Sequence, residues 1–307
     1  MARGRRKGRP IHGWLCIDKP AGLTSTDVVN RVKRATQASK VGHGGTLDPL
    51  ATGVLPVALG EATKTVQYVI DGIKHYRFTA RFGEGRDTDD RDGEVTATSA
   101  GRPDDARILA ALPGFVGEIE QVPPRYAAVK IQGERAYDLA RRGEVVELEP
   151  RPVWIDDLRL IARPDLDHAE FELTCGRGTY VRAVVRDLGL MLGCYAYVDA
   201  LRRLRVGPFA ADDAISLETL DRLVGDDSLP QALIPVGTAL EGLPSLALTE
   251  PQAARIRAGQ TVHVAPNLLV GEAGEDDPTI RAMAAGRVVA LARLHGSELS
   301  PLRVFNL

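Results

Sequence analysis

The segment that decides the fold is Gly42-His43-Gly44-Gly45-Thr46-Leu47-Asp48-Pro49-Leu50-Ala51-Thr52-Gly53, which combines four glycines with one imidazole and one carboxylate. Glycine permits backbone conformations and close approaches that other residues avoid. Pro49 disfavours helical geometry for the residue before it. We therefore expect Asp48 to project from a constrained loop, although an isolated loop aspartate is most often a turn former.

On both sides of this loop, apolar periodicity predicts a mixture of strands and helices. Thr24 and Asp27 form a variant of the capping box at the start of a helix. Cys175 falls on the apolar phase of a strand, so we expect a core residue. Strands are predicted at 13–18, 54–59, 75–82, 171–175 and 201–206, and helices from 24, 61 and 181. Without strict βαβ alternation, this order indicates an α+β fold.

The charge pattern divides the chain into segments. Residues 1–10 form a basic, flexible tail, and 123–152 is a charged stretch typical of a mobile basic loop or a solvated connector. Acidic residues, proline and glycine between about 224 and 244 suggest a linker. A main domain over 11–240 and a small β-rich module over 245–307, with a helix near 248–259, are therefore expected.

Composition narrows the class of protein without naming a partner. The 307 residues are 44% hydrophobic, with a net charge of −2. No apolar run reaches membrane-spanning length, and a signal-peptide core is absent. Three widely spaced cysteines fit neither a disulfide framework nor a zinc site, which favours a reducing cytoplasm.

Several ligand-binding motifs fail on inspection. Residues 60–65 lack the glycine that a phosphate loop places before its lysine. The acidic stretch 87–98 has Arg91 at a calcium-ligand position and Thr98 where the closing glutamate belongs, so a polar hairpin turn fits better. The histidines have no paired metal-ligand spacing, and no dinucleotide-binding glycine pattern follows a strand.

Five segments resemble the motifs of the TruB-type pseudouridine synthase family, in the family's order from Ile11 to Val206. They are the loop 42–53 and the stretches 14–25, 74–77, 175–182 and 201–203. Family members commonly carry threonine where this chain has Gly44, which leaves His43 and Asp48 in place. Residues after Leu248 resemble, more weakly, a PUA-like RNA-binding module.

The resemblance implies a role for each matching residue. Asp48 would be the nucleophile, Tyr76 would stack on the target uracil and assist proton removal, and Arg182 would pair with Asp48. His43 would fill the space of the flipped base, and Tyr180 and Leu201 would line the pocket. Taken singly, the tyrosines also fit core packing, His43 a turn, and Arg182 a solvated helix face.

The fold and reaction implied by the resemblance follow from those roles. The expected fold is a mainly antiparallel sheet of the pseudouridine synthase type with flanking helices, a thumb-like insertion at 123–152 and a PUA-like module. The implied function is isomerisation of uridine 55 in the tRNA T loop, with tRNA phosphates bound by Lys130, Arg141 and Arg142. Because isomerisation gains or loses no atom, no cofactor or metal is expected, nor a membrane or protein partner. We expect a monomer; a tRNA-folding module with secondary catalysis is the alternative.

Overall fold

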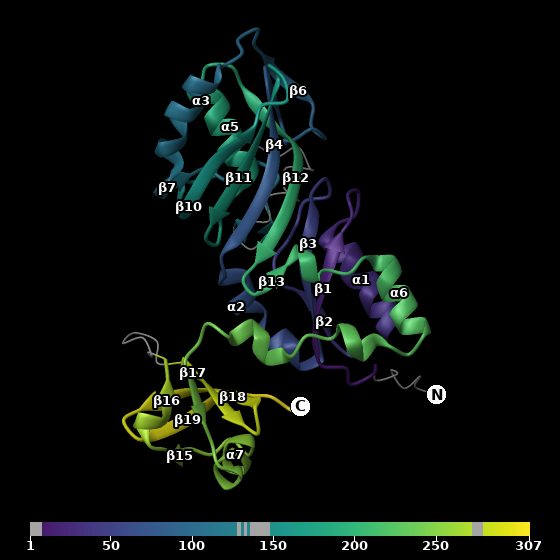
Figure 1. Ribbon diagram of the computed structural model, residues 1–307, viewed down its shortest axis with the longest axis vertical. Helices are drawn as coiled ribbons and strands as arrows, with labels where there is room; N and C mark the ends of the chain where they lie inside the picture. The colour runs from purple at the N-terminus through teal and green to yellow at the C-terminus, as the bar shows by residue number, and fades with distance from the viewer. Residues whose placement is uncertain (1–7, 128–129, 132–133, 136–147, 272–278) are drawn as a thin grey trace.

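The computed structural model describes residues 8–127, 130–131, 134–135, 148–271 and 279–307. Figure 1 shows a long sheet with helices at both of its ends and a small β-rich domain below it. We call residues 8–240 the large domain and residues 245–307 the small domain.

The large domain is built on one nine-stranded sheet. Neighbouring strands in the sheet run antiparallel, except that β3 and β12 are parallel. The α+β fold predicted from the order of elements and the mainly antiparallel sheet implied by the family resemblance are both confirmed. Seven strands follow the order β1 (Gly13–Lys19), β3 (Thr52–Leu59), β12 (Ala196–Val206), β4 (Lys74–Phe82), β11 (His168–Cys175), β10 (Arg151–Ala162) and β7 (Gly117–Gln121), while β2 (Val41–His43) pairs with β3 and β13 (Phe209–Ala210) with β12.

Strict alternation makes β4 and β11 the centre of the core. Tyr76, Phe78, Ala80 and Phe82 of β4 are buried, as the alternating pattern predicts. Phe78 stacks on Phe171 of β11 with ring centroids 5.3 Å apart. Cys175 on the same face is 1% exposed, so its prediction as a core residue is confirmed.

Local signals fix the helices that cover the sheet. Thr24 caps α1 (Ser25–Thr36) through a capping box with Asp27, as predicted. The helix predicted from residue 61 begins instead as a 3₁₀ turn at 60–65, because Thr63 and Thr65 donate to carbonyls three residues back, and α2 follows. The other bounds are α2 (Val66–Asp71), α3 (Asp105–Ala111), α5 (Val181–Met191) and α6 (Leu217–Gly225), with short strand pairs β5 (Glu84–Arg86)–β6 (Val95–Thr98) and β8 (Lys130–Ile131)–β9 (Glu134–Arg135).

The stretch expected to be a linker, 224–244, packs against the large domain instead. The backbone of Ile234 exchanges two 2.8 Å hydrogen bonds with Trp14 of β1. Val236 and Leu240 are buried in the same cluster as Trp14. The linker prediction was wrong because these apolar residues are interspersed among the prolines, glycines and acids that suggested it.

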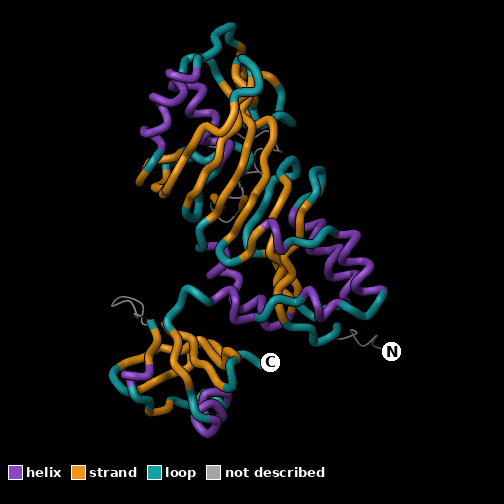
Figure 2. The backbone as a smooth tube through the Cα atoms, in the orientation of Figure 1, coloured by secondary structure: helices purple, strands orange, loops and turns teal. Residues whose placement is uncertain are grey.

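The small domain carries the expected β-rich fold, and its sheet stands out in the tube view of Figure 2. Its core gathers Leu246, Ile256, Ile280 and Leu299. The predicted helix is confirmed as α7 (Glu250–Arg257). The strand order is β15 (Val262–His263), β19 (Glu298–Val304), β18 (Arg287–His295), β17 (Thr279–Ala284), β14 (Ser245–Ala247) and β16 (Leu269–Val270).

The two domains share one apolar cluster. Phe305, Val288 and Leu291 of the small domain belong to the cluster that holds Trp14. The Nζ of Lys64 donates to the Val304 carbonyl at 2.8 Å. The small domain is therefore a fixed part of the molecule.

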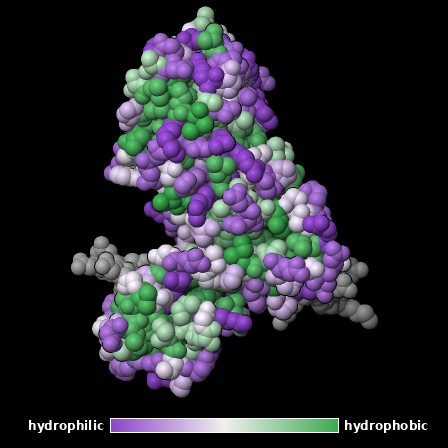
Figure 3. All heavy atoms as spheres, viewed as in Figure 1, coloured by the Kyte–Doolittle hydropathy of each residue, from purple (hydrophilic) through white to green (hydrophobic). Residues whose placement is uncertain are grey.

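On the face drawn in Figure 3, hydrophobic residues gather on the side of α3 and α5 and again on the small domain. Leu109 of α3 and Leu190 and Met191 of α5 are each more than half exposed. None of the helices in the described ranges is long and apolar enough to span a bilayer.

Replacing Gly53 with alanine should destabilise the protein strongly. Gly53 has a φ of +99°, and a Cβ there would overlap the carbonyl oxygen of Arg203 in β12. We expect backbone strain and overpacking together to lower the free energy of unfolding by about 3 kcal/mol, measured by urea denaturation. Gly22→Ala is the control, because Gly22 has a φ of +83° but open space at its Cβ. Equal losses in both variants would contradict the close contact.

Candidate active site

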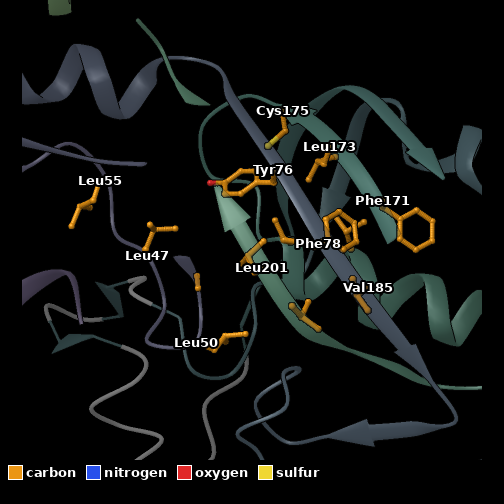
Figure 4. Packing of buried hydrophobic residues seen from close by; sticks show 14 of the residues in the cluster. Leu47, Leu50, Leu55, Tyr76, Phe78, Phe171, Leu173, Cys175, Val185 and Leu201 are labelled. Atoms are coloured by element: carbon orange, nitrogen blue, oxygen red, sulfur yellow. The ribbon is translucent and has the colours of Figure 1, made fainter. Parts of the chain in front are cut away.

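The loop that carries Asp48 connects β2 to β3 and is anchored on both sides. Leu47 donates its backbone N–H to Ser25 Oγ at 2.8 Å, and the Ser25 hydroxyl donates to the Leu47 carbonyl at 3.1 Å. The Pro49 carbonyl accepts from the Gly22 N–H at 2.8 Å. Leu47 and Leu50 point into the core (Figure 4), so the carboxylate between them is left at the surface, 30% exposed.

Arg182 meets Asp48 from the first turn of α5. Its Nη2 donates to Asp48 Oδ1 at 3.0 Å, and its Nε lies 2.9 Å from Oδ2 without hydrogen-bond alignment. The Arg182 side chain is only 4% exposed, which rules out the solvated helix face. A buried guanidinium that bonds one carboxylate oxygen and lies within ion-pair distance of the other fixes the orientation of the Asp48 side chain.

The acidic hairpin between β5 and β6 completes the surroundings of Arg182. Nη1 donates to the Thr88 carbonyl at 2.8 Å and lies 3.6 Å from Asp90 Oδ2. Nη2 also donates to the Tyr126 carbonyl at 3.1 Å. Burial raises the pKa of Asp90. Arg182 thus links Asp48 to a second, buried carboxylate.

Sequence reasoning missed this second carboxylate. Residues 87–98 do form a hairpin turn, as predicted, but Asp89 and Asp90 are buried rather than solvated. Burial raises the pKa of Asp89 to about 6, and Arg186 pairs with it at 3.2 Å. The sequence signal that was not used is the cluster of aspartates in this hairpin, which could pair with the arginines of α5.

Tyr76 forms the inner wall of the site. It lies in β4 between Leu173 of β11 and Arg203 of β12. In Figure 4 its hydroxyl points away from Phe171, toward the segments that hold Leu47 and Leu55. Burial raises the pKa of the phenol, and the nearby Arg203 charge opposes that rise. Leu201 of β12 lies beside Tyr76 and is also buried.

The remaining predicted residues are only partly brought together. Tyr180 is the N-cap residue of α5, and its phenol pKa is raised first by burial and then by the Asp48 charge. His43 is half-buried at the end of β2, opposite Val57. The backbone of Lys130 lies in β8, whereas Arg141 and Arg142 lie outside the described residues.

Lys19 is a second residue that sequence reasoning did not assign. It is fully buried at the end of β1, and its Nζ donates to the carbonyls of Pro20, Leu23 and Pro49 at 2.9, 2.6 and 3.2 Å. Lys19 therefore holds the far side of the Asp48 loop. Burial lowers its pKa to about 8, against the nearby charge of Asp48.

The buried Lys19 predicts a pH-dependent stability. An unfolded lysine has a pKa of about 10.4, so between the two pKa values the unfolded chain binds more protons and the free energy of unfolding rises with pH. From about pH 7.5 to about pH 9.5, wild type should gain about 2 kcal/mol relative to Lys19→Met. Urea denaturation across this range measures the difference. Parallel curves for the two proteins would contradict the assignment.

The part of the chain that carries most of the site residues matches one known family. Residues 33–181 match the family described as "TruB family pseudouridylate synthase (N terminal domain)", and residues 182–241 match "tRNA pseudouridylate synthase B C-terminal domain". The chain belongs to the TruB family. The resemblance seen in the sequence is thus confirmed, and the chain is a pseudouridine synthase.

Curated relatives of the TruB family align over nearly the full chain. A Bradyrhizobium diazoefficiens protein named tRNA pseudouridine synthase B is 55% identical over 99% of this chain and 88% of its own length. A protein of the same name from Caulobacter vibrioides is 51% identical, with both chains fully covered.

Solved structures agree with the TruB fold. A chain from "Crystal Structure of a Cbf5-Nop10-Gar1 Complex" superposes with a TM-score of 0.76 at 27% identity, covering 96% of this chain and 85% of that one. A chain from an H/ACA RNP bound to a substrate RNA containing 2'-deoxyuridine gives a TM-score of 0.75 at 24% identity, with 100% and 92% covered. The second likeness bears on the fold alone.

Proposed function

We propose that this protein converts uridine 55 in the T loop of tRNA to pseudouridine. The observation that carries the proposal is the Asp48–Arg182 pair, in which a buried guanidinium holds a partly exposed carboxylate on the loop toward which the Tyr76 hydroxyl points. The relatives at 51–55% identity are named for a tRNA substrate, which supports tRNA as the RNA bound here.

Asp48 is the nucleophile in this proposal. Its carboxylate attacks either C1′ of the ribose or C6 of the base, and the bond between N1 and C1′ breaks. The uracil turns, C5 bonds to C1′ and the bond to Asp48 breaks. C5 then loses its proton and N1 gains one, so no atom is added or removed. A carboxylate that adds and leaves again is a common covalent catalyst, and Arg182 orients it.

Tyr76 holds the uracil. A uridine in folded RNA must leave its stack before it can react, and aromatic stacking retains a flipped base. The pKa of the phenol is raised, so the phenol stays neutral, and a neutral phenol is a poor base for the C5 proton. This favours stacking as the role of Tyr76. Leu201 and Tyr180 would line the pocket, and His43 would occupy the vacated position in the RNA.

The rest of the chain would bind the RNA backbone. Lys130, Arg141 and Arg142 are proposed to contact phosphates, which position an RNA without reading its sequence. The small domain would act as the PUA-like module. We further propose a cytoplasmic monomer that needs no protein partner, whereas the Cbf5 chain was solved in a complex with Nop10 and Gar1.

The test uses the purified protein alone with an unmodified tRNA transcript. We expect pseudouridine at position 55, mapped by chemical modification and sequencing, and none when uridine 55 is replaced by cytidine. Light scattering should give the mass of one chain. Pseudouridine elsewhere, or only after another protein is added, would contradict the proposal.

A further inference from the structure

Another charged side chain lies beneath the site and takes no part in the chemistry above. Arg203 of β12 is 1% exposed and ranks among the largest fully buried side chains of the described residues. Its neighbours Arg202 and Arg205 are partly or fully exposed on the same strand. Arg203 is therefore a cation in the interior.

The partners of Arg203 are backbone carbonyls from the catalytic loop and its strand. Nη2 donates to the Gly45 carbonyl at 3.0 Å and Nη1 to the Thr46 carbonyl at 3.3 Å. Nε donates to the Val54 carbonyl at 2.8 Å. These three acceptors bracket Asp48 on both sides in sequence, so one guanidinium spans the whole loop.

The same guanidinium lies against Tyr76. Arg203 and Tyr76 are directly paired between β12 and β4. Burial raises the pKa of the phenol, and the charge of Arg203, followed by hydrogen bonding to it, lowers that pKa. Because arginine only donates, the phenolic oxygen must accept, which leaves the phenol proton directed elsewhere.

Stability alone gives a poor reason for this arrangement. A buried cation is expensive to desolvate, and replacing buried ionic groups with apolar ones is often neutral or stabilising. Arg202 pairs with both carboxylate oxygens of Asp18 at 3.0 and 2.8 Å. Within the residues that the structure describes, Arg203 has no such ion pair and binds neutral carbonyls and a neutral phenol.

We propose that Arg203 is a positioning residue that holds the Asp48 loop and the Tyr76 phenol in one fixed arrangement beneath the target uracil. The proposal rests on the proposed roles of Asp48 and Tyr76. The planar guanidinium of arginine has five N–H donors, so it can bond the loop carbonyls and the phenol at the same time. A lysine ammonium or an uncharged side chain cannot do this.

The experiment compares Arg203→Met, Arg203→Lys and Arg203→Gln with wild type. The readouts are the single-turnover rate at saturating protein, the Kd for tRNA, and Tm. We expect Arg203→Met to lower the rate about 10²-fold, since a small misplacement of reacting groups has that effect. The Kd should stay unchanged because phosphate contacts dominate affinity. Arg203→Lys should recover only part of the rate.

The matched control is Arg205→Met. Arg205 is exposed on the same strand and donates to the Gly207 carbonyl at 2.9 Å. Its single-turnover rate should equal that of wild type. A second comparison introduces Arg203→Lys into the Tyr76→Phe variant, which lacks the phenol oxygen. There Arg203→Lys should lower the rate by a smaller factor than it does in wild type.

Several results would overturn the proposal. These are a wild-type rate in Arg203→Met or Arg203→Lys, a fall in tRNA affinity that explains the whole loss, or additive effects with Tyr76→Phe. Loss of the native fold in all three Arg203 variants, judged by circular dichroism, would assign the residue to folding alone. The rate is measured at the uridine that the wild-type protein isomerises. If that uridine is not at position 55, the proposed specificity fails but the role of Arg203 is still tested.

Discussion

Replacing Asp48 with asparagine should abolish pseudouridine formation while tRNA binding persists. The amide keeps the size of the side chain but carries no charge and cannot attack carbon. We expect a loss of about 10⁴-fold or more, as for removal of other nucleophiles. Release of tritium from C5 of labelled uridine measures the reaction, because that proton leaves when C5 joins the sugar. Filter binding measures the Kd for tRNA.

The matched control for Asp48→Asn is Asp212→Asn, at an exposed aspartate in a 3₁₀ turn after β13. The control should release tritium at the wild-type rate. Full activity of Asp48→Asn would contradict nucleophilic catalysis by this residue. The same variant tests the alternative function: if it still accelerates tRNA folding, the protein also has a folding activity that does not need the reaction.

Replacing Arg182 with methionine should cause the second-largest loss. The change leaves the buried carboxylate of Asp90 without its cation and the Thr88 and Tyr126 carbonyls without a donor. Breaking a buried charge network in this way lowers the free energy of unfolding by about 3–5 kcal/mol. Because Asp48 also loses its orientation, the rate should fall about 10³-fold, in line with the loss of a group that stabilises reacting charge.

The control for Arg182→Met is Arg186→Met, one turn later in α5. Arg186 pairs with Asp89 and Asp187 and makes no contact with Asp48. Urea denaturation should show a loss of stability in both variants, whereas tritium release should fall steeply only in Arg182→Met. A comparable fall in both would show that the helix, not the Asp48 contact, controls the rate.

The elements that sequence predicted well are those with local causes. The capping box of Thr24 and Asp27 lies within one turn, and the alternation along β4 needs only its own nine residues. The inward valines of α5 follow helical spacing, and Val181, Val184 and Val185 are buried as predicted. Such signals do not depend on contacts with the rest of the chain, so the elements they predict are also the elements that form.

The candidate site depends on contacts that no local pattern contains. Asp48 and Arg182 are 134 residues apart, and their pairing was predicted from the family resemblance, not from periodicity. The burial of Lys19, Asp90 and Arg203 was not predicted because hydropathy places charged residues at the surface, whereas here hydrogen bonds and ion pairs allow it. The failed linker prediction has the same origin, since composition does not show which apolar residues find a partner.

The central position of β12 also governs how the protein reaches its active form. β12 lies between β3 and β4, and the Thr52 hydroxyl bonds the Leu201 carbonyl across a separation of 149 residues. Such non-local pairing raises contact order and slows folding. The Asp48 loop and Tyr76 belong to strands that meet only through β12. A partly folded chain therefore lacks the arrangement of Asp48 and Tyr76 on which the proposed reaction depends.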